Sequence, residues 1–384
     1  MADRCDIAIV GGGIVGAAVA LGLSQAGFDV RLLEAGAAPP PAPEPVDPRV
    51  YAIAPSSASL LQRLGVWPVP RLCAYDGMQV WESAPERALR FSAADVGRVQ
   101  LGWIAEQSQL LGALWAALPA RVPMTQARVL AAEYGSDAAR LQLEGGQTLH
   151  ASLVIAAEGA QSPLRERAGI VLHSRDYGQQ AVVTHVECSE PHRGVALQRF
   201  LPGGPLALLP LADGRRSVVW SLPADEAQAM CALPDDAFHQ ALASAIQFEA
   251  GAISASTPRL LFPLRLIHAE QYVRERLVLI GDSAHVIHPL AGQGVNLGLG
   301  DVEQLLTTLT QARDERRDWS GLRVLRRYER ARKAANIEMI ALTDALDRAF
   351  RTPVALLPRV LDNGLALLDR VAPAKRLLIQ RALA

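Results

Sequence analysis

The chain has almost no net charge, few cysteines and no long hydrophobic segment. Its 384 residues include 38 Lys and Arg against 39 Asp and Glu, a formal net charge of −1, so no global basic field is available to hold nucleic acid. The four cysteines lie far apart without a CxxC pair, so we expect neither a metal site nor a disulfide framework. No run of about 18 apolar residues could span a membrane, and the N-terminal apolar stretch runs straight into glycines, unlike a signal peptide. We therefore expect a cytoplasmic protein that is soluble or, at most, peripheral on the inner face of the membrane.

The first 34 residues have the pattern of a nucleotide-binding unit. A short apolar run at 5–10 is followed by glycines at 11–16, an alanine-rich segment at 17–27 and a second apolar run at 29–34. The order strand, glycine turn, helix, strand is the βαβ unit of a doubly wound sheet.

The glycines of this unit form a GxGxxG fingerprint at Gly11, Gly13 and Gly16. In such a turn the backbone approaches a pyrophosphate, whose charge lies at the N-terminus of the following helix. Glu34 ends the second strand, where a carboxylate can accept hydrogen bonds from ribose hydroxyls. An acidic residue at this place favours FAD or NAD over NADP.

The rest of the chain alternates between two kinds of pattern. Half of the residues are hydrophobic and 20% are charged, which predicts a folded chain. Residues 36–48 are proline-rich and predict an extended loop, and residues 55–67 predict a helix with a Ser N-terminal cap and a Gly terminator. Short strands at 75–100 and 177–262 predict an antiparallel sheet inserted into the nucleotide-binding framework, while helical spacing returns at 105–118.

A second informative segment covers residues 277–305. The apolar run at 276–282 predicts a buried parallel strand that ends in Gly281 and Asp282, so that a carboxylate lies at the carboxyl edge of the sheet, within reach of a ribityl or ribose hydroxyl. Gly292 and Gly294 precede a predicted helix, whose backbone N–H groups and dipole can meet negative charge on a reduced flavin ring.

The string HPLAGQGVNLGLGD at 288–301 matches, at every specified position, a signature typical of ubiquinone-biosynthesis hydroxylases. From Asp6 to about Pro373 the chain resembles the FAD-dependent aromatic hydroxylases of the p-hydroxybenzoate hydroxylase fold. The resemblance implies noncovalent FAD as cofactor and NAD(P)H and O₂ as co-substrates. It places Arg49 near the FAD phosphates, Gln107 on a helix that contacts FAD, and Asp282 on the ribityl chain.

The full set of cofactor-binding residues that the resemblance implies is Gly11, Gly13, Gly16, Glu34, Arg49, Gln107, Glu158, Asp282, Pro289, Gly292, Gly294, Val295 and Asn296. Flavin-ring contacts with an effect on catalysis are expected from Pro289, Gln293, Gly294 and Asn296. No general base is assigned, because the flavin performs the difficult chemistry.

One position departs from the family pattern. Where the family usually has Ala-Asp-Gly, in contact with both FAD and the nicotinamide nucleotide, this chain has Ala157, Glu158 and Gly159. Glutamate carries the same negative charge on a longer side chain. The contact with both nucleotides is therefore still possible, but its geometry would differ from that of aspartate. His285 and His288 have no third ligand nearby, so we expect them to pack or to position the flavin rather than to bind metal.

The predicted fold is therefore α/β, a Rossmann-like FAD-binding domain with an inserted antiparallel-sheet substrate domain and C-terminal helices. The predicted domains are a discontinuous FAD-binding domain (1–74, 101–176 and 263–350), a substrate domain (75–100 and 177–262) and a C-terminal helical segment (351–384).

The predicted activity is hydroxylation of the aromatic ring of a polyprenyl phenol or quinol intermediate in ubiquinone biosynthesis. The alternatives are a related hydroxylase for a pigment or phenolic acid precursor, a flavin reductase or halogenase, and a non-catalytic FAD-bound subunit of an assembly. The sequence does not specify which ring position is hydroxylated, how long the prenyl chain is, whether NADH or NADPH is used, or the oligomeric state.

The basic C-terminal region from Arg313 to Ala384 carries 16 Lys and Arg against 9 Asp and Glu, a local charge of 16 − 9 = +7. Together with its aliphatic runs, this charge suits contact with an anionic bilayer. Ordinary packed helices, or a surface for a ubiquinone-biosynthesis assembly, are the alternatives.

Overall fold

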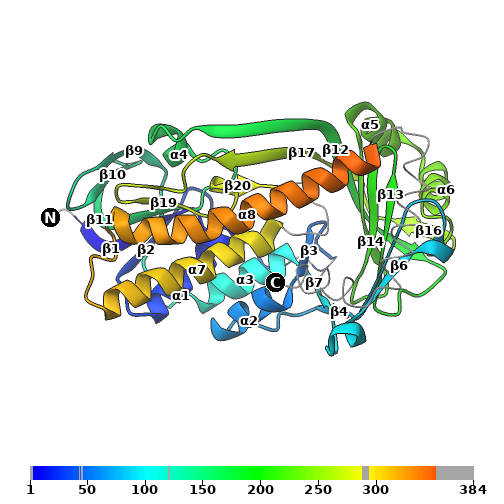
Figure 1. Cartoon of the computed structure of the whole chain (residues 1–384), viewed down its shortest axis with the longest axis horizontal. Coiled ribbons are helices and arrows are strands. Elements are labelled where there is room, and N and C mark those ends of the chain that lie inside the picture. Colours follow the sequence, from blue (N-terminus) through cyan, green and yellow to red (C-terminus); the bar gives the residue numbers. More distant parts are fainter. Residues whose placement is uncertain (1–2, 43, 45, 120–121, 288–293, 352–384) are drawn as a thin grey trace.

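Two large β-sheets lie at opposite ends of an elongated molecule, and long helices cover one of them (Figure 1). The computed structural model describes residues 3–42, 44, 46–119, 122–287 and 294–351. Pro289, Gly292 and Gln293 of the predicted site, His288, and the predicted C-terminal segment from residue 352 onward lie outside the described residues.

The nucleotide-binding sheet has the strand order β18-β19-β11-β1-β2-β8. Its central strands are parallel, as the βαβ pattern predicts. The strands are β1 (Asp3–Val10), β2 (Val30–Glu34), β8 (Met124–Gln126), β11 (Thr148–Ala156), β18 (Val273–Arg274) and β19 (Leu277–Leu279), with the hairpin β9 (Val129–Tyr134) and β10 (Ala139–Leu143) attached to β11.

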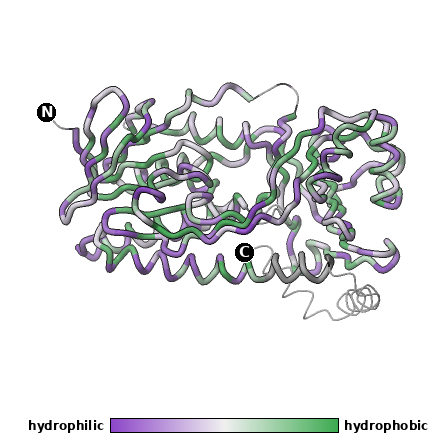
Figure 2. The backbone as a smooth tube through the Cα atoms, turned by 90° about the horizontal axis from the view of Figure 1, so that it is seen from above, coloured by the Kyte–Doolittle hydropathy of each residue, from purple (hydrophilic) through white to green (hydrophobic). Residues whose placement is uncertain are grey.

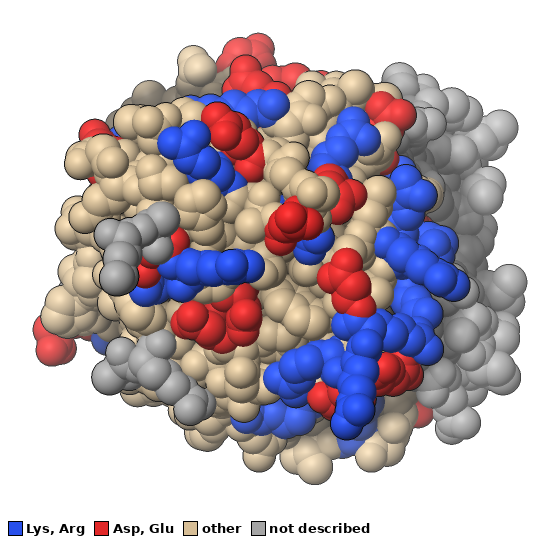
Figure 3. All heavy atoms as spheres, turned by 90° about the vertical axis from the view of Figure 1, so that its left-hand side faces the viewer, with Lys and Arg blue, Asp and Glu red and all other residues tan. Residues whose placement is uncertain are grey.

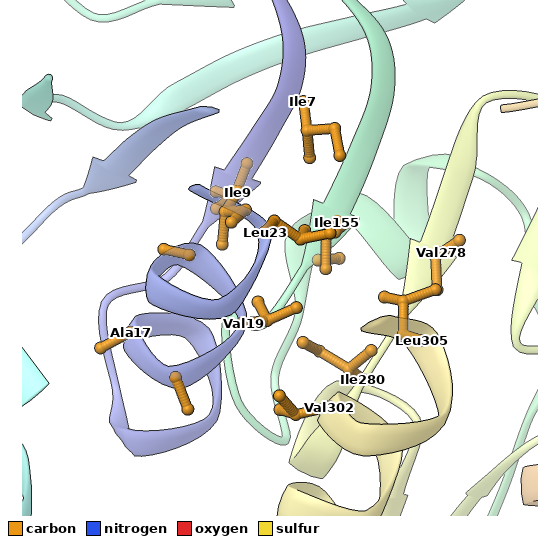
Figure 4. Packing of buried hydrophobic residues seen from close by; sticks show 14 of the residues in the cluster. Ile7, Ile9, Ala17, Val19, Leu23, Ile155, Val278, Ile280, Val302 and Leu305 are labelled. Carbon is orange, nitrogen blue, oxygen red and sulfur yellow. The ribbon is translucent and has the colours of Figure 1, made fainter. Parts of the chain in front are cut away.

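Helices pack on this sheet through one continuous apolar core. They are α1 (Ile14–Gln25), α3 (Gln107–Ala117), α7 (Gly294–Asp314) and α8 (Leu322–Arg351); α1 packs against α3 and α7, and α7 against α8. Figure 4 shows Ile9 and Ile155 of the sheet facing Val19 of α1, with Val302 of α7 close by. This burial fixes the carboxyl ends of β1, β11 and β19, the edge at which nucleotides bind in open α/β sheets.

The second sheet is antiparallel except for the parallel pair β5–β13. Its order is β20-β17-β12-β15-β14-β13-β5-β6, with β16 paired to β12. The strands are β5 (Gly77–Trp81), β6 (Leu89–Ser92), β12 (Leu172–Cys188), β13 (Val195–Leu201), β14 (Gly204–Pro210), β15 (Arg216–Pro223), β16 (Ile253–Ser256), β17 (Leu260–Ala269) and β20 (His285–Val286).

The two faces of the second sheet differ because side chains alternate along each strand. One face, which includes Val182, Val218 and Trp220, belongs to the apolar cluster that Phe238 and Leu242 of α6 complete. This cluster lies under α5 (Ala224–Ala232) and α6 (Asp235–Ala245). The other face is turned toward the nucleotide-binding half and lines a cavity.

A small third sheet, β3 (Val50–Ile53), β7 (Gly102–Glu106) and β4 (Cys73–Tyr75), lies between the two halves. Two short helices complete the framework, α2 (Pro55–Arg63) and α4 (Pro163–Arg167). The α/β fold with an inserted antiparallel sheet is confirmed, as are the predicted helix at 105–118 and the three predicted strands between 195 and 223.

Two local predictions were wrong in detail. The helix after residue 54 has Ala54, not serine, at its N-cap, because Pro55 occupies the first position and the Ala54 N–H donates to the Asn296 side chain at 3.0 Å. The strand predicted at 276–282 ends at Leu279, since Gly281 adopts a φ of +56° and starts a 3₁₀ turn, Gly281–Ser283.

Helix α8 runs the length of the nucleotide-binding half, starting at the end remote from the second sheet (Figure 1). Hydrophilic and hydrophobic residues alternate along it (Figure 2). In its first turns Leu325 and Tyr328 are buried while Arg326 and Arg330 are exposed, so one side packs and the other faces water. Within the described residues, none of the helices is both long and apolar enough to cross a membrane.

Candidate active site

The glycine turn between β1 and α1 has the geometry of a phosphate-binding loop. Gly11 has a φ of +104°, and a Cβ there would lie 2.3 Å from the Ala157 carbonyl oxygen; a Cβ on Gly16 would lie 1.9 Å from the Gly11 carbonyl oxygen. At Gly13, by contrast, a Cβ would meet nothing within 4 Å. Helix α1 begins there without a side-chain cap or an acidic residue. Its free N–H groups and the open space fit a pyrophosphate.

Glu34 lies beside this turn and holds it in place. Its Oε1 accepts a hydrogen bond from the Gly36 N–H at 2.8 Å and its Oε2 accepts one from the Gly12 N–H. The Trp115 indole N–H donates to the Gly12 carbonyl at 2.8 Å from the other side. The carboxylate is thus fixed at the end of β2, where the fingerprint places a ribose-binding group.

Arg49 and Gln107 come together where β3 meets the start of α3. The Gln107 N–H donates to the Arg49 carbonyl at 3.0 Å, and the Tyr51 hydroxyl donates to Gln107 Oε1 at 2.8 Å. Burial raises the pKa of Tyr51 to about 12, so the phenol remains a donor. The Arg49 guanidinium lies 4.6 Å from the ring centroid of Phe262, on the wall of the cavity.

Asp282 occupies the turn after β19, at the carboxyl edge of the sheet. Its side chain is exposed, and among the described residues no donor bonds to it. Neighbouring protein atoms reduce the hydration of the carboxyl group and raise its pKa, and the nearby His285 and Arg49 only partly oppose this shift. An accessible carboxylate to which no group of the described residues donates a hydrogen bond fits a ligand that offers hydroxyl groups.

The turn that carries Asp282 is held by a buried carboxylate on α7. Asp301 Oδ2 accepts hydrogen bonds from the Gly281 N–H at 2.9 Å and from His285 Nε2 at 2.6 Å, while Oδ1 accepts from Arg332 Nε at 2.7 Å. Burial alone would raise the pKa of Asp301, but His285 and Arg332 lower it below its usual value. Asp301 therefore acts as an anion that joins the turn, α7 and α8.

Gly294, Val295 and Asn296 form the first turn of α7. Gly294 and Val295 line the cavity. The Asn296 side-chain amide forms hydrogen bonds with the backbone of the neighbouring segment. Its Nδ2 donates to the Ala52 carbonyl at 2.8 Å, and its Oδ1 accepts from the Ala54 N–H at 3.0 Å. Asn296 thereby fixes α7 against β3, the strand that follows Arg49.

Glu158 is part of a structured loop after β11. Its Oε2 accepts hydrogen bonds from Ser162 Oγ at 2.6 Å and from the Leu164 N–H at 3.1 Å. Burial raises the pKa of the carboxyl group, and these two hydrogen bonds only partly oppose the shift. Arg165 extends the same loop toward the Asp282 turn by donating to the Ser283 carbonyl at 3.0 Å.

A cavity of about 410 Å³ lies between these residues and the second sheet. Arg49, Val50, Val286, Ile287, Gly294 and Val295 form its wall on the nucleotide side. The remaining wall is mostly apolar and includes Tyr75, Met78, Phe91, Leu101, Val183, Leu197, Ala207, Leu209, Val219, Phe262 and Leu264. A cavity of this size and composition suits an aromatic ring with an attached hydrocarbon chain.

Several residues of this arrangement were not predicted from the sequence. Asp301 closes the 288–301 signature, which was the one available signal, but its partners Arg332 and His285 carry no motif that links them. The cavity wall could not be predicted either, because it depends on which face of the second sheet each strand presents.

The fold and the site define a flavin-binding class of protein, and the sequence comparisons agree. The chain belongs to the family described as FAD binding domain, which it matches over residues 4–343. Within it, the chain is 38% identical to 3-demethoxyubiquinol 3-hydroxylase of Escherichia coli, over 98% of both chains. It is 35% identical to ubiquinone hydroxylase UbiL of Rhodospirillum rubrum, over 100% of this chain and 90% of the relative. It is 34% identical to human ubiquinone biosynthesis monooxygenase COQ6, over 96% and 90%.

Solved structures share the fold at lower identity. p-Nitrophenol 4-monooxygenase PnpA from Pseudomonas putida superposes with a TM-score of 0.78 at 18% identity, covering 100% of this chain and 99% of that one. HpxO from Klebsiella pneumoniae, solved with FAD and uric acid, gives 0.75 at 20% identity, covering 98% and 97%. The predicted family, the cofactor FAD and the class of FAD-dependent monooxygenase are confirmed; NAD(P)H is the reductant typical of this class.

Proposed function

We propose that this enzyme hydroxylates the aromatic ring of a polyprenyl phenol or quinol intermediate of ubiquinone biosynthesis. The observation that carries the proposal is the cavity, whose wall on one side comes from the predicted flavin-binding segments and on the other from apolar side chains of the second sheet. The names of the relatives point to the same substrate class. A single phenolic ring without a hydrocarbon chain would contact only part of this apolar wall.

FAD, when bound, would supply the redox chemistry, namely reduction by NAD(P)H and activation of O₂ for transfer of one oxygen atom to the ring. The chain binds and orients this cofactor. The Gly11–Gly16 turn and the free N–H groups of α1 would hold the pyrophosphate, Glu34 would bind the ribose, and Asp282 would accept hydrogen bonds from the ribityl hydroxyls.

The remaining predicted residues have supporting roles in this proposal. Arg49 and Gln107 reach the cofactor from the β3–α3 junction. Gly294 and Val295 line the cavity where the flavin ring would lie, and Asn296 acts as a positioning residue through Ala52 and Ala54. The flavin contacts expected from Pro289, Gly292 and Gln293 lie outside the described residues. The apolar lining excludes water, which would otherwise divert the activated oxygen.

We also propose the domain boundaries predicted from the sequence, with a substrate domain at 75–100 and 177–262. Most strands of the second sheet fall within 75–100 and 177–262, but β12 starts at Leu172 and β17 ends at Ala269. Both long strands therefore extend into the FAD-binding part, and they join the two halves of the molecule covalently and by pairing.

The test compares a phenol carrying a short prenyl chain with the same phenol without it. We expect NAD(P)H oxidation and a hydroxylated product, detected by mass spectrometry, with a KM at least about tenfold lower for the prenylated compound, since each buried CH₂ contributes about 0.8 kcal/mol. Ala207→Phe, which fills part of the cavity, should abolish this preference while FAD content stays unchanged.

The reductase, the non-catalytic subunit and the hydroxylase of another aromatic each have their own outcome in this experiment. Fast NAD(P)H oxidation without any phenol would indicate a reductase, and none with any phenol a non-catalytic subunit. Equal turnover of the prenylated and unprenylated phenols would favour the hydroxylase of another aromatic.

We also propose that the basic C-terminal region contacts an anionic membrane surface, with contact to a ubiquinone-biosynthesis assembly as the alternative. Exposed arginines lie on the first turns of α8, at Arg323, Arg326, Arg327 and Arg330. Figure 3, which views the end of the molecule where α8 begins, shows basic side chains gathered along one side of that face.

A further inference from the structure

The cavity extends across the width of the second sheet. Its lining includes Phe262 and Leu264 on β17 at one end, and Met78 on β5 and Phe91 on β6 at the other. In the strand order β17-β12-β15-β14-β13-β5-β6, the two ends are six strand steps apart, which is roughly 29 Å along the sheet at about 4.8 Å per step. The cavity is therefore elongated, and its two ends have different surroundings.

The end at β17 lies beside the predicted cofactor site. The Arg49 guanidinium lies 4.6 Å from the ring centroid of Phe262 there, and Val286 is on β20, the strand paired with β17. Among the described residues that line the cavity, the charged ones are Arg49 and Arg265, and both lie at this end. Because the ring that receives oxygen must lie next to the flavin, a hydrocarbon chain attached to it finds its apolar path toward β5 and β6.

The end at β5 and β6 is lined by apolar side chains that continue to the protein surface. Met78 and Phe91 are opposite each other in the β5–β6 register, and both are half-buried. They belong to one apolar cluster with Leu101, which also lines the cavity, and with Val96, which does not. Apolar contact thus extends from the cavity to the 3₁₀ turn η2 (Ala93–Val96).

Val99 lies on the short segment between η2 and the cavity. It precedes Leu101 by two positions, so the two Cα atoms are at most about 7 Å apart. Its side chain is 86% exposed, the highest value among the large hydrophobic residues that the structure describes. A single exposed hydrophobic residue is ordinary, but this one is next to apolar side chains that lead into a ligand cavity.

We propose that the β5–β6 end of the cavity is the subsite for the prenyl chain of the substrate, an inference that rests on the proposed function. The aromatic ring lies at the β17 end. From there the chain runs over Val219 and Ala207, contacts Phe91, and leaves the cavity past Val96 and Val99. The subsite contacts the first prenyl units, and the rest of a longer chain lies outside the cavity.

A rival exit would follow β17 itself. Leu260, at the start of this strand, is 36% exposed and lies on the same face as Phe262. Arg49 and Arg265 border this route, and Arg265 forms an ion pair with Asp176. A hydrocarbon chain that left here would remove water from these charges, which is unfavourable. The described lining at the β5–β6 end is uncharged.

The test compares phenols that carry no prenyl unit, one unit and three units, with the holoenzyme. In the wild-type enzyme KM should fall as the chain lengthens, since more CH₂ groups are buried. Val99→Asp and Phe91→Ser should raise the KM for the three-unit phenol about tenfold, which corresponds to lost contact with roughly two CH₂ groups. The KM for the phenol without a chain, kcat and FAD content should stay unchanged in both variants.

Two control variants test whether the effect belongs to this end of the cavity. Leu130→Asp changes a side chain that is 53% exposed on β9, in the nucleotide-binding sheet, and should keep all KM values at wild type. Leu260→Asp places a charge at the rival exit and should also keep them. A rise for the three-unit phenol in Leu260→Asp, without one in Val99→Asp and Phe91→Ser, would overturn the proposal. An equal rise for the phenol without a chain in Val99→Asp would assign the effect to a general disturbance and overturn it as well.

A direct readout is photolabelling of the holoenzyme by a phenol whose three-unit chain ends in a diazirine. Mass spectrometry after digestion should find the label in the peptide that contains residues 93–101, and label confined to other segments would overturn the proposal. If wild-type enzyme hydroxylates the prenylated phenols while Val99→Asp and Phe91→Ser keep its KM values, the subsite is wrong and the proposed function stands. If wild-type enzyme forms no product from any of these phenols, the proposed function itself fails.

Discussion

At the scale of single residues, the site combines groups that hold the protein together with groups left available for ligands. Glu34, Asn296 and Asp301 are bonded to backbone N–H groups of neighbouring segments. Asp282 has an accessible carboxylate instead, and Gly13 faces open space. The bonded residues fix the positions of loops, whereas Asp282 and Gly13 are available to contact a cofactor.

Glu158 gives the sharpest residue-scale prediction, because the chain has it where the family pattern has aspartate. Its raised pKa means that the folded state binds a proton more tightly than the unfolded state. Its effect on stability therefore becomes less favourable as pH rises from 4.5 through the raised value. At pH 7, Glu158→Gln, which keeps an acceptor for Ser162 and Leu164 without the charge, should be as stable as wild type or more stable in urea unfolding.

Glu158→Ala should instead lose about 1–3 kcal/mol, because two donors lose their acceptor. It should also raise the KM for NAD(P)H more than that for the phenol, since the loop is the predicted nucleotide contact. Unchanged stability and kinetics in the alanine variant would reduce Glu158 to a solvated loop carboxylate.

At the scale of elements, the Asp301 network joins α7 and α8 to the turn that presents Asp282. Asp301→Asn removes the charge that faces Arg332 and His285. Breaking a buried ion pair on one side costs about 3–5 kcal/mol, and we expect this loss in urea unfolding at pH 7, together with weaker FAD binding by titration. Because the pKa of Asp301 is lowered, its stabilisation is complete above the ordinary value of 3.8 and is lost as pH falls below it.

The control for this prediction lies on the same helix. Glu303 forms an exposed ion pair with Arg63, and exposed pairs contribute at most about 1 kcal/mol. Glu303→Gln should therefore leave both stability and FAD affinity close to wild type. A loss in Asp301→Asn no larger than that in Glu303→Gln would show that the network does not hold the turn.

The elements also show which features a sequence can predict. The β1–α1–β2 unit was predictable because its signals are local: Gly11 and Gly16 are required by contacts within a few residues or with the adjacent strand. The link from Asp301 to Arg332, and the contact of Arg49 with Phe262, depend on helix packing and strand arrangement across long separations. The cap at Ala54 was missed for the same reason, since its partner Asn296 is 242 positions away.

At the scale of the whole molecule, the cavity lies at the junction of the two halves, and the described basic cluster lies elsewhere. Arg326 and Arg327 are on the first turns of α8, at the end remote from the second sheet (Figure 1). A membrane bound through this cluster would therefore contact the nucleotide-binding end. Delivery of a polyprenyl substrate to the cavity would need the bilayer, or a partner protein, to reach the junction as well.

The membrane proposal can be tested by comparing variants that lose the same positive charge inside and outside the arginine cluster on α8. In flotation with anionic liposomes at low salt, wild-type protein should bind, and Arg326→Gln combined with Arg327→Gln should bind about 30-fold more weakly, because each basic residue near the surface contributes about 1 kcal/mol. Arg90→Gln combined with Arg98→Gln removes the same charge from exposed positions in and just after β6, on the side of the second sheet (Figure 1), and should bind as wild type. Binding should fall in all proteins at high salt, as the screening length shortens to about 3 Å at 1 M. Absence of wild-type binding at low salt would contradict the membrane proposal, and it would make an acidic partner in an enzyme assembly the better explanation of the arginines.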